Sequence, residues 1–215
     1  MKDRSLTINI ASLGALQVSN FAVILITLPY LTRVLGVSAW GEIIFVQLVV
    51  NYSIWFVNWG FYHGATRRVA ASRKDSINLN IIFSTVWSAQ WLLTGLILTI
   101  ILLAVYIFSS EITNPELYII ASGLLIGNLF MPLWFLNGME FIKESAIIQL
   151  LIKVIALPFI FLLVNNSEDA IIYLWIETIA SITVGIISLF WMRRTFDISF
   201  SFPALIQIWA TIKED

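Results

Sequence analysis

Long runs of apolar residues, separated by short polar connections, constrain the fold of this 215-residue chain more than any other feature. Inside a bilayer every backbone N–H and C=O group must be hydrogen-bonded within the protein, so a spanning segment is either a helix or a strand of a closed barrel. A barrel strand needs about 10 alternating residues, whereas a spanning helix needs about 20. The runs have the longer length and do not alternate, which predicts an all-α integral membrane protein. Six spans are expected, at residues 8–30, 41–62, 81–108, 117–137, 146–164 and 170–192.

The composition excludes most other classes of protein. Apolar residues make up 60% of the chain and charged residues 12%, against about 45–50% and about 25% in a typical soluble domain. Twelve basic and thirteen acidic residues nearly cancel, which argues against a nucleic acid partner. The chain has no cysteine and a single histidine, which leaves no donor set for a zinc or iron–sulfur centre. We therefore expect neither a metal nor a cofactor.

The distribution of lysine and arginine predicts the orientation, because cytoplasmic loops are enriched in both residues. With six spans, ten basic residues fall on the side of the N-terminus, the opposite side has only Arg33, and Lys153 lies within a span. Both termini are therefore expected in the cytoplasm. Residues 195–215 form either a cytoplasmic tail or the start of a further helix. The ten residues are Lys2, Arg4, Arg67, Arg68, Arg73, Lys74, Lys143, Arg193, Arg194 and Lys213.

Polar residues recur on one face of the second predicted span. They are spaced by three or four residues, which places them on one side of a helix. Polar groups inside a membrane normally face the protein interior or a hydrated cavity. Bonds between helices and a shared cavity are therefore both open interpretations. The third span and the sixth span, which contains Ser181 and Gly185, show similar stripes. The residues of the second span are Gln47, Asn51, Trp55, Asn58 and Tyr62.

Two charged residues lie inside predicted spans. Burying Lys153 costs about 2.5–3.5 kcal/mol on insertion scales, so a compensating partner is expected. That partner is either a structural one such as Glu177 or an anionic substrate in a cavity. Glu177 could instead accept a coupling proton, because burial favours a neutral carboxyl group. Arg33 is either an interfacial anchor or a ligand for phosphate.

Two further features have mainly structural interpretations. A cluster of basic residues follows the second span and determines topology, and it could also hold anionic lipid head groups. The GxxxG step formed by Gly123 and Gly127 is typical of close helix packing. The residues of the basic cluster are Arg67, Arg68, Arg73 and Lys74.

Several short motifs, in order along nearly the whole chain, resemble those of bacterial O-antigen and polysaccharide flippases. These flippases belong to the multidrug/oligosaccharidyl-lipid/polysaccharide exporter superfamily. The first motif is similar to the first loop of the family, the second group to its second span and the following loop, and the third to its fourth span. The motifs are residues 28–36 (LPYLTRVLG) with 40–41 (WG), then 56–61 (FVNWGF) with 65–70 (ATRRVA) and 73–75 (RKD), then 127–128 (GN) with 132–140 (PLWFLNGME).

The resemblance implies movement of an undecaprenyl-pyrophosphate-linked oligosaccharide from the cytoplasmic to the periplasmic leaflet of the inner membrane by alternating access. Family members have two six-helix lobes, so this chain corresponds to the N-terminal lobe. The second lobe would be a missing C-terminal half or a second copy of the chain, and membrane lipids are further partners. The resemblance supports Lys153 as a phosphate ligand, because such proteins tend to carry a basic residue in the fifth helix. We further expect Arg33 to bind the pyrophosphate. The expected sugar contacts are Asn51, Trp55 and Asn58.

Other functions remain open at this point. A drug exporter of the same superfamily would need an acidic, aromatic pocket for cations, and Lys153 argues against one. A membrane enzyme acting on lipid-linked sugars would need acidic residues clustered on one face, whereas Asp75, Glu140 and Glu144 lie in different loops. An inactive truncated lobe and a non-transporting scaffold are further possibilities. Of these functions, the resemblance favours transport without chemistry, and so not an enzyme.

Overall fold

The computed structural model describes residues 2–58, 60–204, 207–209 and 211, with side chains at positions 18, 19 and from 21 onward. This part of the chain contains helices and no strand, which confirms the predicted all-α class. Tail residue Lys213 and the side chains of Lys2 and Arg4 lie outside the described residues. The elements are α1 (Lys2–Val57), α2 (Gly64–Ala71), α3 (Ser76–Ile107), α4 (Pro115–Leu129), α5 (Leu133–Gly138), α6 (Ile142–Leu163), the 3₁₀ turn η1 (Ser167–Asp169) and α7 (Ala170–Phe196).

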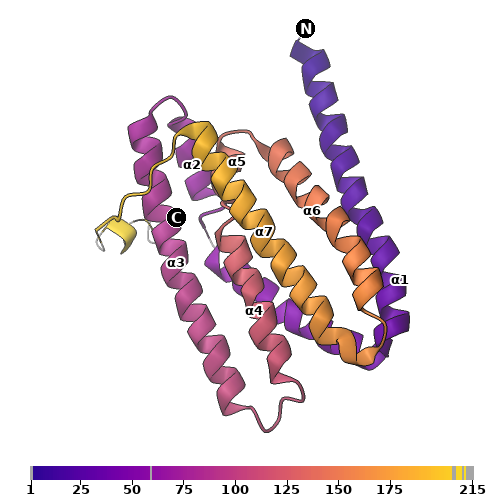
Figure 1. Ribbon diagram of the computed structural model, residues 1–215. Helices are drawn as coiled ribbons and strands as arrows, with labels where there is room; N and C mark the ends of the chain where they lie inside the picture. Colours follow the sequence, from indigo (N-terminus) through magenta and orange to yellow (C-terminus); the bar gives the residue numbers. More distant parts are fainter. Residues whose placement is uncertain (1, 59, 205–206, 210, 212–215) are drawn as a thin grey trace.

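The first two predicted spans form the two arms of α1, which turns back sharply within its length (Figure 1). The turn lies at Gly36, whose φ of 77° and ψ of 166° are not helical. Helix continues on both sides of this residue, where a loop was expected, so six predicted spans correspond to five helices. By length and composition, five helices of the described chain could cross a membrane: Phe21–Val57, Ser76–Ile107, Pro115–Gly138, Ile142–Leu163 and Ser167–Phe196.

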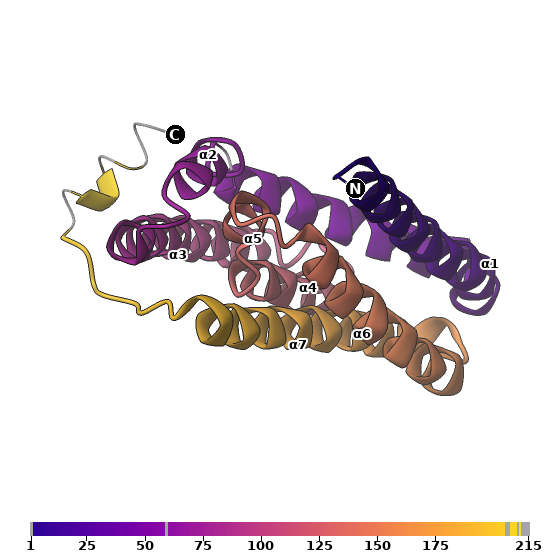
Figure 2. The same cartoon turned by 90° about the horizontal axis from the view of Figure 1, so that it is seen from above.

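Helix α4 lies in the middle of the bundle, between the second arm of α1 and α7 (Figure 2). It packs closely on α7 because small residues face each other. A Cβ added at Gly127 would lie 2.7 Å from the Ser181 carbonyl carbon, and one added at Gly185 would lie 2.5 Å from the Gly127 oxygen. Thr178 Oγ1 also donates a hydrogen bond to the Ile120 carbonyl, at 3.0 Å. The GxxxG step is therefore a packing motif, as predicted.

Replacing Gly127 by alanine is expected to destabilise the bundle, because the new methyl group would collide with the backbone of α7. Overpacking of this kind costs about 1–3 kcal/mol in the free energy of unfolding. Thermal unfolding in detergent, followed by circular dichroism, would measure the loss. The matched control is Gly95→Ala in α3, where an added Cβ meets nothing within 4 Å. Equal melting temperatures for the two variants would contradict the packing role of Gly127.

The chain is interrupted between α4 and α5, within one membrane-length segment, and side chains of other helices donate to carbonyl groups there. Such breaks in a membrane require replacement donors. Near the end of α4, the Trp87 indole N–H donates to the Leu129 carbonyl at 3.0 Å. In α5, Thr66 Oγ1 donates to the Trp134 carbonyl, also at 3.0 Å. These bonds tie α2, α3, α4 and α5 together where the chain is irregular.

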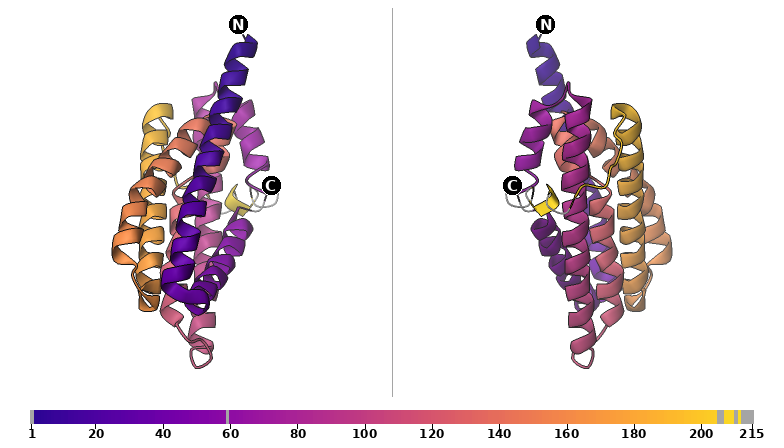
Figure 3. Two further views of the ribbon diagram at one scale, coloured as in Figure 1. Left: turned by 90° about the vertical axis from the view of Figure 1, so that its right-hand side faces the viewer. Right: turned by 90° about the vertical axis from the view of Figure 1, so that its left-hand side faces the viewer.

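The helix ends that carry the basic residues lie at one end of the bundle. The N-terminus, α2, the start of α6 and the end of α7 are all at the top in Figures 1 and 3. The kink of α1 lies at the opposite end. This arrangement is the one that the charge distribution predicted for loops on a single side of a membrane.

Candidate functional site

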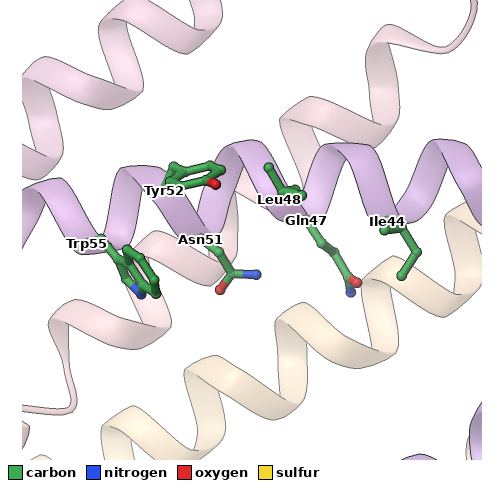
Figure 4. A pocket seen from close by; sticks show the side chains of 6 residues that line it. All are labelled: Ile44, Gln47, Leu48, Asn51, Tyr52 and Trp55. Atoms are coloured by element: carbon green, nitrogen blue, oxygen red, sulfur yellow. The ribbon is translucent and has the colours of Figure 1, made fainter.

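A groove of about 300 Å³ runs along the second arm of α1 and contains three of the predicted polar and aromatic residues. The side chains of Gln47, Asn51 and Trp55 leave the helix on the same side (Figure 4), as their spacing predicted. Asn51 and Trp55 are exposed, and the Trp55 ring contacts the Tyr52 ring edge-on at 5.9 Å. Ile44 and Leu48 complete the lining. The groove therefore combines amide groups with aromatic faces, the two surfaces that a sugar binds.

A cluster of polar side chains lies beside this groove, between α1, α6 and α7. The Lys153 ammonium group acts electrostatically on the Glu177 carboxylate, which in turn acts on Tyr173. The Gln47 side chain lies close to the Tyr173 hydroxyl group. Lys153 is exposed and Glu177 is half-buried, so the cluster is open on the α6 side. The structure thus brings Lys153 and Glu177 together, and Gln47 joins their cluster to the groove.

Tyr173 is the member of the cluster that the sequence analysis missed. It is 7% exposed, and its ring packs edge-on against Trp40 with the centroids 5.7 Å apart. A tyrosine near the end of an apolar run is typical of an interfacial anchor. The signal that could have found it is its position four residues before Glu177, which places both on one face of α7.

Asn58 does not line the groove, although it shares the spacing of Gln47 and Asn51. Helix α1 ends at Val57, and the Asn58 backbone N–H still donates to the Ile54 carbonyl of its last turn, at 3.0 Å. Its side chain points into the protein and bonds Asn128 and Gln90, at 2.9 and 2.7 Å. The structure therefore places Asn58 in a bonded network within the bundle, apart from the other predicted sugar contacts.

The polar stripe of the sixth predicted span faces α4 over most of its length. Ser181 and Gly185 pack against Gly127, and Ser188 is fully buried. The stripe therefore does not line a hydrated cavity, which the sequence left open. The small residues on this face allow the backbones of α4 and α7 to approach closely.

The predicted arginine and lysine sites differ in how far they are engaged by the protein. Arg33 is exposed three residues before the kink, at the opposite end of the bundle from α2. Arg67 and Lys74 are also exposed. Arg73 is exposed but bound to the protein: it forms an ion pair with Glu140 at 2.7 Å, and its Nε donates to the Gly138 carbonyl at 2.7 Å. Arg68 is half-buried in α2.

The described residues contain no group of three or more histidine, cysteine or acidic side chains that could hold a metal ion. The amide groups of the groove can donate and accept hydrogen bonds, and the ammonium group of Lys153 nearby is positively charged. Five membrane-length helices and no strand in the described residues define the class: this is an all-helical, multi-pass membrane protein.

The chain belongs to the family described as polysaccharide biosynthesis proteins, whose family model matches residues 6–213. This confirms the family that the motifs predicted. A relative named "Putative O-antigen transporter" from Escherichia coli (strain K12) is 32% identical over 193 residues, which cover 86% of this chain and 45% of the relative. A relative of the same name from Shigella dysenteriae is 27% identical over 192 residues, covering 86% and 46%. The chain thus spans about half the length of these relatives. No solved structure matches it.

Proposed function

We propose that this chain forms one lobe of a flippase that moves an undecaprenyl-pyrophosphate-linked oligosaccharide from the cytoplasmic to the periplasmic leaflet of the inner membrane. The observation that carries the proposal is the groove of amide and aromatic groups beside a lysine within a membrane-length helix, in a chain of the polysaccharide biosynthesis family. The names of the relatives, which refer to O-antigen transport, support the same substrate class.

The groove would replace the water around the sugar while the polyprenyl tail stays in lipid. Asn51 offers amide donors and acceptors to sugar hydroxyl groups, and the exposed Trp55 ring offers a stacking face. Lys153 would offset the negative charge of the pyrophosphate, since a cation at that depth is costly without an anion. Glu177 would hold Lys153 when no substrate is bound and would accept the coupling proton. No covalent bond is made or broken, so the function is transport and not enzymatic catalysis.

The basic residues at the helix ends would serve the membrane surface. Arg67, Arg68 and Lys74 lie in or just after α2 and would attract anionic lipid head groups. Arg73, although it forms an ion pair with Glu140, would also attract these head groups. Both termini would face the cytoplasm. Arg33, on the opposite side, would bind phosphate when the substrate arrives there.

A second lobe is needed for alternating access, because the groove is open to the outside of this one. Since the relatives are about twice as long, the second lobe would be the part of them that the chain does not cover, or a second copy of the chain. Two such lobes with the same orientation could pair about an axis along the membrane normal.

Replacing Lys153 by alanine is expected to lower the O-antigen on the cell surface about tenfold or more, because a charge-assisted contact to phosphate is lost. The variant would be expressed in a bacterium that lacks its own O-antigen transporter, alone and fused to the part of the Escherichia coli relative that the chain does not cover. Gel electrophoresis of lipopolysaccharide measures the product. Lys143→Ala, at the start of α6, is the control. Normal O-antigen in the Lys153 variant would overturn the proposal.

A further inference from the structure

Four side chains from four helical segments form a continuous row of hydrogen bonds beneath the groove-bearing arm of α1. The Trp134 indole N–H donates to Gln90 Oε1 at 3.0 Å. Gln90 Nε2 donates to Asn58 Oδ1 at 2.7 Å, and Asn58 Nδ2 donates to Asn128 Oδ1 at 2.9 Å. Trp134 and Gln90 are 2% and 3% exposed. The row thus connects α5, α3, the end of α1 and α4 inside the bundle.

The chemistry of tryptophan fixes the direction of this row. An indole nitrogen can only donate, so Gln90 must present its oxygen to Trp134. The Gln90 amino group then has to face Asn58, which must accept through its oxygen. The Asn58 amino group is left for Asn128 and for the Ile54 carbonyl, to which it also donates at 3.0 Å. Each amide therefore has one orientation, and loss of the indole donor would remove the constraint from the whole row.

Asn58 directly follows the arm of α1 that carries the groove. It lies three residues after Trp55 and seven after Asn51, so a fixed Asn58 sets the rotation of these residues about the helix axis. Its bond to Ile54 ties it to the last turn of the helix. A helix can roll about its axis at little cost when only apolar contacts hold it, whereas an unpaired buried amide is costly.

We propose that Gln90 and Trp134 are positioning residues that fix the roll of the second arm of α1, so that Gln47, Asn51 and Trp55 face the groove. The orientation stands on the row of hydrogen bonds alone. Its importance for transport rests on the function proposed above. Neither residue touches the groove, so both act through Asn58.

Cysteine labelling can test the orientation directly, because the sequence contains no cysteine. Two reporters would be used one at a time: Asn51→Cys on the exposed groove side and Val50→Cys, where the native valine is 2% exposed. A polar thiol reagent applied to membranes should label the first reporter quickly and the second slowly. In the Trp134→Phe background, the labelling rate of Asn51→Cys divided by that of Val50→Cys should fall about tenfold, because a buried amide would then lack its partner.

Trp87→Phe is the matched control, because Trp87 also donates from its indole but to the Leu129 carbonyl and not to the row. The control should leave the labelling ratio unchanged. Gln90→Met, which removes the central amide at similar volume, should narrow the ratio as Trp134→Phe does. Immunoblotting of membranes would verify that each variant is present.

The outcomes separate this proposal from the proposed function. An unchanged ratio in both row variants, or an equal change in Trp87→Phe, would overturn the positioning of α1. Absence of both row variants from the membrane would overturn it as well, because the row would then determine folding and not orientation. Labelling does not depend on transport. A lower ratio of labelling rates would therefore still support the positioning role even if the Lys153→Ala variant had normal O-antigen.

Discussion

Replacing Gly36 by alanine is expected to lower the amount of protein in the membrane sharply. The φ of 77° and ψ of 166° at this residue lie in a region that is almost confined to glycine, and a side chain there costs about 1–3 kcal/mol. The strained residue would lie where α1 turns back. A backbone change that relieves the strain would therefore move the two arms apart. Immunoblotting of membranes and thermal unfolding in detergent would measure the effect.

Gly41→Ala is the matched control for this prediction. Gly41 lies in the helix five residues later, and an added Cβ there meets nothing within 4 Å. Alanine is favoured over glycine in a helix by about 1 kcal/mol, so this variant should be as stable as the parent chain or slightly more stable. Similar losses for the two variants would show that the conformation of Gly36 is not the cause.

Reversing the charge of Lys153 is expected to have the second large effect. Lys153→Glu would bring a second carboxylate, on α6, close to Glu177 on α7. A charge without a counter-ion costs about 2.5–3.5 kcal/mol at the centre of a membrane helix. We therefore expect a large fall in membrane-inserted protein, together with loss of O-antigen. The first effect would be followed by immunoblotting and the second by gel electrophoresis of lipopolysaccharide.

The exchanged pair, Lys153→Glu with Glu177→Lys, separates structure from transport. It restores opposite charges, so the protein level should recover to near that of the parent chain. The O-antigen should remain low, because the ammonium group now projects from α7 instead of α6 and no longer meets the phosphate at the same place. Full O-antigen with the exchanged pair would mean that only the opposite charges matter, and a persistently low protein level would contradict the electrostatic interaction of the two residues.

Most of the fold could be predicted because the bilayer permits few structures. Apolar runs of about 20 residues must be helices there, and their number follows from the loops. The continuity of α1 was not predictable in the same way. Residues 31–40 contain one glycine and several helix-compatible residues, and only the backbone angles at Gly36 distinguish a bent helix from two helices with a loop.

The candidate site was predictable where residues of one helix share a face, and not where residues of different helices meet. The spacing of Gln47, Asn51 and Trp55 identified a common face, and the structure places them on one groove. Asn58 instead bonds Gln90 of α3 and Asn128 of α4, and the spacing along α1 does not reveal these partners. Lys153 and Glu177 come close from two different helices, α6 and α7. A spacing rule within one helix cannot reveal this proximity.

The hydrogen bonds of Asn58 and the ion pair of Arg73 bear on which positions identify related sequences. The second and third groups of motifs that resemble the family contact each other: Asn58 bonds Asn128, and Arg73 bonds Glu140. Such positions preserve the skeleton of the lobe, while the groove on α1 lies outside most of them. If the proposed function holds, related proteins that bind different saccharides should keep these contacts and differ along the groove.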